Sequence, residues 1–590
     1  MNNIIGLKKV ILKIPISIII KHYTKMLSET KLALLHQIIQ NATAEEIIWT
    51  KGYLAGCLDR NLNDLSNSNQ PLLSAVSVKP LIIYGTETGN SKKVAIQLLS
   101  NFKKNKIQAK AIDVFQYDTA KLDKENLILF VISTQGEGEF PQNALAFYDY
   151  LKAANINLNN LSFAVLGLGD TSYPLFCNAG VLLDEVLVEK GAKRLLPLAK
   201  ADLDFADTVT AWENDLKSVF QNQDAVKTEI KAIVPKLNHK KNYTGQISHK
   251  IVLNDRESNK ETYHIEITSN DEIVYEPGDA LGIIPKNTPE DVAFILNYFE
   301  TNASKKIKIK EENDSAQEWL LRRNIRGLSK RIVDQIALLL ETNSIEEKAD
   351  LITVLKQNKK PKKAKIEALL EILLPVAPRL YSISSSLEAH DGQVHLTVNL
   401  NKFSKDNIEK TGFASQYLAD YPLHTELEFY IHKNNNFRLP SDETDIIMIG
   451  PGTGIAPFRS FISQRDVTGA EGRNWLFFGE QHFVSDFYYQ TEIQEWIGTG
   501  ILTKLDTAFS RDQKEKIYVQ DRIREKANEF NNWLQNGASL YICGQKAPMS
   551  IDVEAAIIEV IANERNISND AAKQVLEDLE AAGKYQKDVY

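Results

Sequence analysis

Short apolar runs alternate with helical stretches in two parts of the chain. The runs at 81–85, 127–134 and 162–170 are each followed by a stretch with helical periodicity, and a helix near 207–220 closes this series. This alternation is typical of a parallel sheet with crossover helices. It returns from residue 441 to the C-terminus. The pattern therefore predicts a multidomain α/β protein, with a doubly wound parallel sheet over residues 81–220 and a second α/β domain over residues 441–590.

Strand-like alternation of period two occupies the part of the chain between these units. It covers the runs 243–253, 261–269, 280–285, 380–386, 394–400 and 426–432. In the middle of this series, residues 288–375 are helical in pattern and rich in lysine, with no strand signal. Alternation of this kind favours antiparallel strands. We therefore expect an antiparallel β-barrel over residues 238–440 with a helical insertion at 288–375.

The remaining segments predict a short arm and two linkers. Residues 27–60 resemble two helices, whereas 61–80 are rich in asparagine and serine, and 221–237 are polar and end near a proline. Residues 1–26 are an uncertain extension. Either translation starts at Met26, or these residues form a loose surface-anchoring helix. A signal peptide is disfavoured because no A-x-A-like cleavage site follows. No apolar run approaches the ~20 residues of a membrane-spanning helix.

Composition narrows the class of protein. A chain of 590 residues predicts about four domains at ~150 residues each. Its 43% hydrophobic and 25% charged residues are typical of a globular protein, and the net charge of −8 argues against a nucleic-acid binder that relies on a positive field. The three cysteines lie too far apart in sequence for a zinc or iron–sulfur motif. They favour a reducing compartment such as the cytoplasm.

Three glycine-rich loops follow strands of the first α/β unit. The first runs from Gly85 to Asn90 and opens a helix, whose backbone N–H groups attract a phosphate. It lacks the lysine of a triphosphate-binding P-loop, so it suits a monophosphate. The other two loops begin at Ser133 and Leu168, and all three should meet at the carboxyl edge of the sheet. Tyr173 then offers an aromatic face to a flat ring.

A second phosphate-binding pattern lies in the barrel. Arg379 and Tyr381 share one face of a predicted strand, so a guanidinium can clamp a pyrophosphate while a ring stacks beside it. The strand continues through Ser382, and Leu380 lies between the two clamp residues. A loop from Gly412 to Ser415 again opens a helix.

The last α/β unit opens with a strand, a glycine-rich turn and a helix. In the sequence GPGTGIAPFR at 450–459, three closely spaced glycines allow a pyrophosphate to approach the helix start. Further along, Arg511 and Lys516 can neutralise a 2′-phosphate, with Ser510 and Tyr518 as hydroxyl donors. This group favours NADPH over NADH, whose readers place a carboxylate on the ribose.

Taken in this order, the motifs resemble the diflavin reductase family from about residue 80 to the end. The family resemblance implies FMN, FAD and NADPH as cofactors. Segments such as STQGEGEFP, LGDTSYPLFC and SRDQKEKIYVQD resemble the branch that delivers electrons to a sirohaem and iron–sulfur hemoprotein reducing sulfite to sulfide. Self-association through the N-terminal region is also implied. A general diflavin reductase serving a cytochrome, and a flavodoxin-like binding module without cofactor, remain alternatives.

The resemblance also implies roles for individual residues. The FMN contacts are Gly85, Thr86, Glu87, Thr88, Gly89, Asn90, Ser133, Thr134, Gln135, Gly136, Glu137, Gly138, Leu168, Gly169, Asp170, Tyr173 and Cys177. The FAD contacts are Arg379, Leu380, Tyr381, Ser382, Thr397, Val398, Asn399, Gly412, Phe413, Ala414 and Ser415. The NADPH contacts are Gly452, Thr453, Ser510, Arg511, Lys516, Tyr518, Gln520 and Asp552. The hydride path is lined by Ser382, Cys543 and Asp588, and Tyr590 covers the flavin.

Three positions depart from the family pattern. Gln135 replaces an aromatic residue of the microsomal relatives, Phe413 replaces a glycine of the FAD phosphate loop, and Gln545 replaces an acid after Cys543. We further expect an acidic rim around the FMN that steers a basic acceptor, although ordinary solvated acids would give the same pattern. Its members are Glu137, Glu139, Asp170, Asp202 and Asp204.

Overall fold

The computed structural model describes residues 79–86, 89–136, 138–171, 173, 175–202, 205–221, 241–309, 312–405 and 408–590. The predictions for residues 1–26 and 27–60, and for nearly all of 61–80 and 221–237, lie outside these ranges. So do those for Glu87, Thr88, Glu137 and Asp204.

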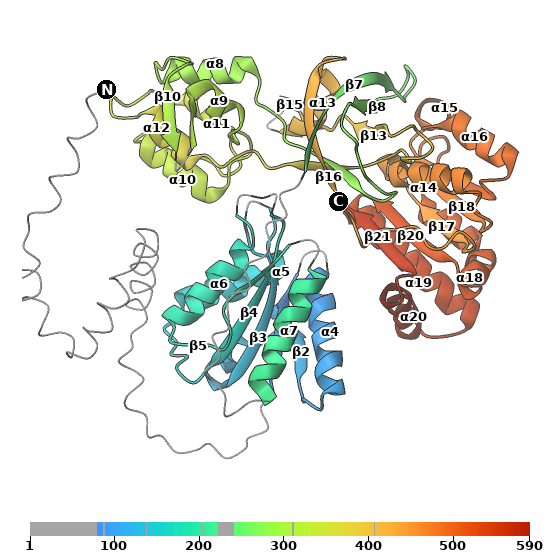
Figure 1. Cartoon of the computed structure of the whole chain (residues 1–590), viewed down its shortest axis with the longest axis horizontal. Coiled ribbons are helices and arrows are strands. Elements are labelled where there is room, and N and C mark those ends of the chain that lie inside the picture. The colour runs from blue at the N-terminus through green and yellow to red at the C-terminus, as the bar shows by residue number, and fades with distance from the viewer. Residues whose placement is uncertain are drawn as a thin grey trace, which may run out of the picture. The chain divides into compact units, whose positions relative to one another are not determined.

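The first α/β unit is a parallel sheet with strand order β2-β1-β3-β4-β5, and β6 pairs with the end of β4 (Figure 1). This is the flavodoxin-like order, in which the strand order reverses beside β1. Its strands are β1 (Leu81–Gly85), β2 (Lys110–Asp113), β3 (Leu127–Ser133), β4 (Ser162–Leu168), β5 (Lys193–Arg194) and β6 (Ala199–Ala201). Its helices are α4 (Asn90–Lys104), the short η2 (Val114–Gln116) and η3 (Thr119–Lys124), α5 (Gln142–Ala153), α6 (Asn178–Glu189) and α7 (Ala206–Gln221).

The alternation of β3 explains why helices cover both faces of this sheet. Ile128, Phe130 and Ile132 pack with α5 and α6, whereas Leu129 and Val131 pack with α4 and α7. Since both sets are fully buried, the strand reads as a continuous apolar run. The carboxyl ends of β1, β3 and β4 therefore open at one edge, where the predicted loops lie.

An antiparallel six-stranded sheet with order β12-β9-β16-β7-β8-β13 follows, as the period-two pattern predicts. A bridge between Ile383 and Leu396 joins the two outer strands and closes the barrel. The strands are β7 (Asn242–Val252), β8 (Thr262–Ser269), β9 (Ala280–Ile283), β12 (Arg379–Ser382), β13 (Val394–Asn399) and β16 (Glu426–His432). A hairpin of β14 (Lys402–Lys405) and β15 (Ile408–Thr411) leads into α13 (Phe413–Asp420).

The insertion is helical but not wholly so. It contains α8 (Pro289–Tyr298), α9 (Ala316–Leu321), α10 (Lys330–Leu339), α11 (Leu351–Gln357) and α12 (Ile366–Ile372) (Figure 1). These helices enclose their own apolar core. The expectation of no strands was wrong, because β10 (Lys306–Ile309) and β11 (Glu312–Ser315) form an antiparallel hairpin. The second strand reads ENDS and carries no apolar residue, so no periodic signal marked it.

The C-terminal unit is a parallel sheet with order β19-β18-β17-β20-β21. Its strands are β17 (Ile446–Ile449), β18 (Asn474–Glu480), β19 (Lys504–Phe509), β20 (Ser539–Gly544) and β21 (Tyr585–Val589). Its helical elements are η4 (Gly452–Gly454), α14 (Ile455–Thr468), α15 (Phe483–Asp486), α16 (Gln490–Thr499), α17 (Val519–Glu525), α18 (Ala527–Gln535), η5 (Lys546–Ser550), α19 (Ile551–Arg565) and α20 (Asn569–Ala581). Among the described helices, none is long and apolar enough to cross a bilayer.

Candidate functional site

The loop after β1 forms a cradle at the start of α4. Gly89 is the N-cap of this helix and has φ of 89°, and its N–H donates to the Thr86 hydroxyl at 2.9 Å. A Cβ at Gly89 would meet no atom within 4 Å, so the glycine is required by its backbone conformation and not by crowding. No acidic residue occupies the first turn of α4. The helix start is therefore suited to an anion.

The second loop is shaped by two glycines and a glutamine. Gly136 and Gly138 both have positive φ, and a Cβ at Gly138 would lie 2.6 Å from the Cβ of Leu175. The amide of Gln135 donates to the carbonyl of Phe140 at 3.0 Å. Gln135, which departs from the family pattern, therefore stabilises the loop by a hydrogen bond within it.

The third loop brings Tyr173 to the same edge. Tyr173 is half-buried, and its N–H donates to the Asp170 carbonyl at 3.0 Å. Cys177 has a different environment: its buried thiol donates to the Gly167 carbonyl at 3.2 Å. Burial raises the pKa of this thiol to about 12. The thiol of Cys177 thus stays protonated and packs below the loop.

The strand β12 presents the predicted flavin clamp. Arg379 is exposed, and one of its nitrogens donates to the Pro378 carbonyl at 3.1 Å. Tyr381 is half-buried, and burial raises the pKa of its phenol, so the ring is neutral. Leu380 is 40% exposed. An exposed guanidinium beside a neutral aromatic ring can hold a diphosphate and a flat ring together.

The predicted residues of β13 point in different directions. Thr397 is buried and its hydroxyl hydrogen-bonds the Tyr489 hydroxyl at 2.6 Å. Val398 lies in the barrel core, and Asn399 is exposed. The Thr397 and Val398 side chains are therefore engaged inside the protein, and only backbone groups of these two residues are available to a cofactor.

The loop predicted to bind the FAD phosphates opens α13 and contacts a residue of the helical insertion. Gly412 is the N-cap, its N–H donates to the Asn401 carbonyl at 2.7 Å, and the Ser415 hydroxyl donates back to the Gly412 carbonyl at 3.0 Å. The ring of Phe413, at the position of the family glycine, lies 4.7 Å from the guanidinium of Arg326 in the insertion. Ala414 is buried beside it. The aromatic residue thus anchors the loop to the insertion.

Three residues predicted to line the hydride path do meet. The Ser382 hydroxyl on β12 donates to Asp588 Oδ2 at 2.9 Å, and Asp588 is the register partner of Cys543 between β21 and β20. Burial raises the pKa of the Cys543 thiol well above its ordinary value, and the Asp588 carboxylate adds to that effect. Burial also raises the pKa of Asp588, while the Ser382 hydroxyl opposes that rise.

The terminal residue folds back on the nucleotide loop. The Tyr590 N–H donates to the Gly544 carbonyl at 3.1 Å, and its hydroxyl bonds that of Thr453 at 2.8 Å. Below this contact, a Cβ at Gly454 would lie 2.2 Å from the Cys543 carbonyl oxygen. The loop approaches β20 this closely because Gly454 has no side chain. Tyr590 nevertheless remains 62% exposed.

The residues predicted to bind the 2′-phosphate of NADPH lie after β19. Ser510 is buried and its N–H donates to the Glu480 carbonyl, whereas Arg511, Lys516 and Tyr518 are exposed. Gly452, Gln520 and Asp552 complete the predicted set: Gly452 has φ of 60°, Gln520 is half-buried in α17, and Asp552 is exposed in the first turn of α19.

No sequence pattern points to Asn434 or Lys260, two residues that make contacts between distant segments. Asn434 reaches Asp588 Oδ1 at 3.5 Å, and Lys260 forms an ion pair with Glu480 at 2.6 Å between the barrel and the last sheet. No local pattern marks them, because their partners lie more than 150 residues away in sequence.

Family models match three stretches of the chain. They are flavodoxin over residues 82–212, the FAD binding domain over 235–324 and 316–417, and the oxidoreductase NAD-binding domain over 448–554. These matches confirm the flavodoxin-like sheet, the FAD domain and the nucleotide-binding domain expected from the sequence.

Curated relatives match nearly the whole chain. It is 36% identical to the sulfite reductase (NADPH) flavoprotein alpha-component of Vibrio cholerae, covering 96% of each chain. It is also 36% identical to the protein of that name from Bacillus subtilis, covering 94% of this chain and 97% of the relative. With the corresponding protein of Mannheimia succiniciproducens the identity is 37%, over 94% of this chain and 98% of the relative. The expected resemblance to diflavin reductases is thereby confirmed.

Proposed function

Because this chain belongs to the family of NADPH-dependent sulfite reductase flavoprotein alpha-components, we propose that it passes electrons from NADPH, through FAD and FMN, to a hemoprotein that reduces sulfite to sulfide. The observation that carries this proposal is the junction of Ser382, Cys543 and Asp588. It joins the strand that holds the flavin clamp to the edge of the sheet that holds the nucleotide loop. A hydride donor and a hydride acceptor would meet there.

The residues of the first sheet fit FMN. The start of α4 provides backbone N–H groups for one phosphate, and the positive-φ glycines of the second loop allow a ring to lie against backbone. Tyr173 offers a face for stacking from the third loop. The buried thiol of Cys177 supports the Gly167–Gly169 backbone from below.

The barrel residues fit FAD. Arg379 and the N-terminus of α13 supply positive charge for a diphosphate, and Tyr381 supplies an aromatic face. When bound, the flavins accept two electrons as hydride and release them singly, which suits transfer from a nicotinamide to a haem or iron–sulfur centre.

The junction residues prepare a site for the nicotinamide. The Cys543 thiol stays uncharged at neutral pH because burial raises its pKa. Ser382 holds the Asp588 carboxylate by donating to it, which fixes the position of both groups. Tyr590 lies over the turn by its bond to Thr453 and is exposed enough to move aside for the ring.

The preference for NADPH rests on exposed cations. Arg511 and Lys516 lie in one loop after β19 and can pair with a 2′-phosphate without paying a burial penalty. Ser510 and Tyr518 offer hydroxyl donors, whereas NADH-binding sites place a carboxylate on the ribose. This donor set matches a phosphate better than the ribose hydroxyl of NADH.

The proposed acceptor is a sirohaem and iron–sulfur hemoprotein, as the resemblance to this family implies, in a reducing compartment such as the cytoplasm. Self-association is proposed on family resemblance alone. The test is to combine the purified, flavin-loaded chain with its hemoprotein and measure NADPH-dependent sulfide. Sulfide formation supports the proposal. Good reduction of cytochrome c with no sulfide would instead favour the general diflavin reductase.

A further inference from the structure

Helix α14 begins at the nucleotide loop and packs on the segment that follows the flavin strand. The guanidinium of Arg459 donates to the Ser384 carbonyl at 2.8 Å, and the Ser460 hydroxyl donates to the Ser385 carbonyl at 2.6 Å. Ser384 lies two residues after Ser382 in the chain. These bonds therefore connect the nucleotide loop to the strand of the flavin clamp.

Arg459 is deeply buried and almost fully bonded. It is 5% exposed, and two of its nitrogens donate to the carboxylate of Glu492 at 2.7 and 3.0 Å. The third nitrogen donates to Ser384 and also to Nδ1 of His395 at 3.2 Å. Its guanidinium lies 4.9 Å from the ring of Tyr489. Such a fork holds four groups in fixed directions, which a lysine cannot do.

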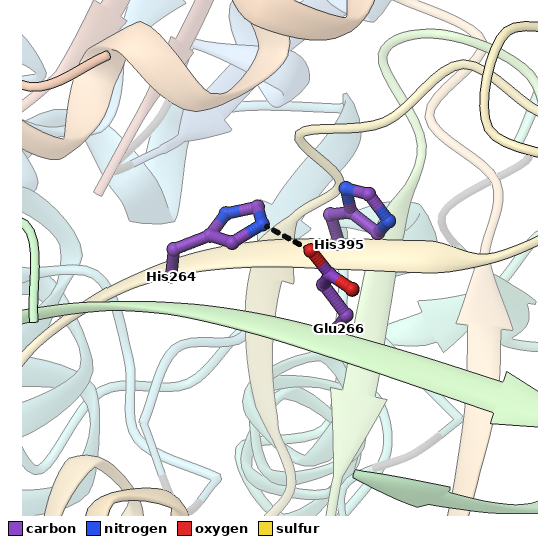
Figure 2. A group of neighbouring side chains, drawn as sticks. All are labelled: His264, Glu266 and His395. Carbon is purple, nitrogen blue, oxygen red and sulfur yellow. Dashed lines mark hydrogen bonds and ion pairs between the residues drawn. The ribbon is translucent and has the colours of Figure 1, made fainter. Parts of the chain in front are cut away.

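Two histidines on the neighbouring strands β8 and β13, His264 and His395, lie beside Glu266 and extend this network (Figure 2). His395 on β13 lies opposite Glu266 on β8, and Nε2 of His264 lies 3.2 Å from a Glu266 oxygen. Nδ1 of His264 bonds the Tyr489 hydroxyl at 3.1 Å. Burial, with Arg459 as the next cause, lowers the pKa of His264 to about 3 and that of His395 to about 2. Both rings are therefore neutral, and Nδ1 of His395 can accept the hydrogen bond from Arg459.

Residue types alone would also suggest a metal site here. The ligand atoms of His264, Glu266 and His395 lie within 4.8 Å of one another, and two histidines with one carboxylate can bind iron. However, Arg459 donates to one nitrogen of His395, and the other lies 3.3 Å from the side-chain oxygen of Gln393. A guanidinium beside the group also repels a divalent cation. The contacts favour a hydrogen-bond network.

We propose that Arg459 is a positioning residue for hydride transfer. Its bonds to Ser384 and His395 hold the nucleotide loop at a fixed distance from Ser382, and so set the separation of nicotinamide and flavin. A hydride transfer is steeply sensitive to distance and angle, and a misplacement of about 1 Å can cost up to ~100-fold in rate. This inference rests on the proposed function, because it presumes that a nicotinamide and a flavin meet at the junction.

The test compares Arg459→Lys with Arg465→Lys in the flavin-loaded full chain. Arg465 is a matched control: it is buried on the same helix, but its side chain donates to the carbonyls of Thr444 and Gly472 within the nucleotide unit. Anaerobic stopped-flow absorbance follows flavin reduction by NADPH. We expect R459K to slow reduction at least tenfold at saturating NADPH, with KM and flavin content within twofold. R465K should lower the melting temperature but leave the rate within twofold.

A rescue experiment separates positioning from mere stability. His395→Ala removes the acceptor of the Arg459 N–H and should slow reduction, whereas His395→Gln restores an acceptor and should recover most of the rate. A wild-type rate in R459K would overturn the proposal. Equal rate losses in R459K and R465K, or no recovery in H395Q, would also overturn it. So would stoichiometric metal that is lost with His264→Ala. The readout needs no hemoprotein, so a failed sulfide assay leaves this test intact.

Discussion

The Ser382 hydroxyl donates to Asp588 Oδ2 across 2.9 Å, although the two residues are 206 positions apart in the chain. This bond joins the flavin strand of the barrel to the last strand of the nucleotide sheet. Cys543 lies beside Asp588 in the same sheet, and Asn434 reaches the second carboxylate oxygen. The candidate hydride site is therefore built from four segments that are distant in the sequence.

Removing this hydroxyl should slow the hydride step specifically. In Ser382→Ala the Asp588 carboxylate loses the shorter of its two hydrogen bonds and keeps only the 3.5 Å bond from Asn434, so its position is less well fixed. We therefore expect flavin reduction by NADPH to fall about tenfold or more, equivalent to ~1.4 kcal/mol or more of transition-state stabilisation. KM should change little. Stopped-flow reduction measures this, with Ser248→Ala, which loses a hydroxyl bond on β7, as the control. An unchanged rate would contradict the assignment of Ser382.

Removing the positive charges that we predict bind the 2′-phosphate should reduce the preference for NADPH. In the Arg511→Gln, Lys516→Gln double variant, we expect KM for NADPH to rise about tenfold or more and KM for NADH to stay within twofold. Both side chains are exposed, so the effect should shrink as salt increases. Steady-state kinetics with the two nucleotides measure this. Lys514→Gln removes an exposed charge of the same loop and is the control; an equal effect there would indicate bulk charge alone.

Truncating Tyr173 should release FMN and leave FAD bound. Tyr173→Ala removes the proposed stacking face, which is worth about 0.5–1.5 kcal/mol beyond the buried area of the ring. We therefore expect FMN content after gel filtration to fall several-fold, with FAD content unchanged. Tyr150→Ala, a half-buried tyrosine on α5, controls for loss of an aromatic residue in the same unit. Full FMN content in Tyr173→Ala would rule out stacking as a main contribution.

The buried histidines should make stability fall in acid. His264 has its pKa lowered to about 3 by burial and by Arg459, with His249 and His390 adding to the effect, whereas an unfolded histidine titrates near 6.5. Since the unfolded chain binds the extra proton, stability is full above pH ~6.5 and decreases as pH falls below it. The loss should reach about 2 kcal/mol by pH 5 for this histidine.

The corresponding measurement is the melting midpoint of the chain between pH 7.5 and 5.0. His264→Gln keeps polar contacts toward Tyr489 and Glu266 but cannot titrate, so its midpoint should fall less steeply with acid than that of the wild type. His424→Gln is the control, because the side chain of His424 is exposed. Parallel slopes in His264→Gln and the wild type would contradict the prediction.

The acidic rim gives a prediction about the acceptor. Replacing Glu137 and Glu139 by Gln should reduce the salt dependence of electron transfer to the hemoprotein, because steering by charge is screened by salt. The rate of hemoprotein reduction across a salt series measures this. Unchanged salt dependence would mean that these carboxylates are ordinary solvated side chains.

The sequence by itself determined the elements and most of the binding loops. Periodicity located β1, β3, β4 and most barrel strands within a few residues, because burial on one or both faces imposes the apolar pattern. Glycine-rich loops after strands indicated phosphate sites for the same local reason: positive φ and close approach, as at Gly89 and Gly454, need a residue without a side chain.

Only the tertiary structure decided the contacts between distant segments. The polar hairpin strand β11 pairs with β10 through its backbone and has no apolar period to reveal it. Phe413 departs from the glycine of the family pattern, and only the structure shows the guanidinium of Arg326 beside its ring. In the sequence, Arg459 is the last residue of the glycine-rich motif at 450–459. Its hydrogen-bond partners Glu492, His395 and Ser384 lie 33, 64 and 75 residues away. Side-chain bonds between elements leave no local pattern, because their geometry depends on packing of the whole chain.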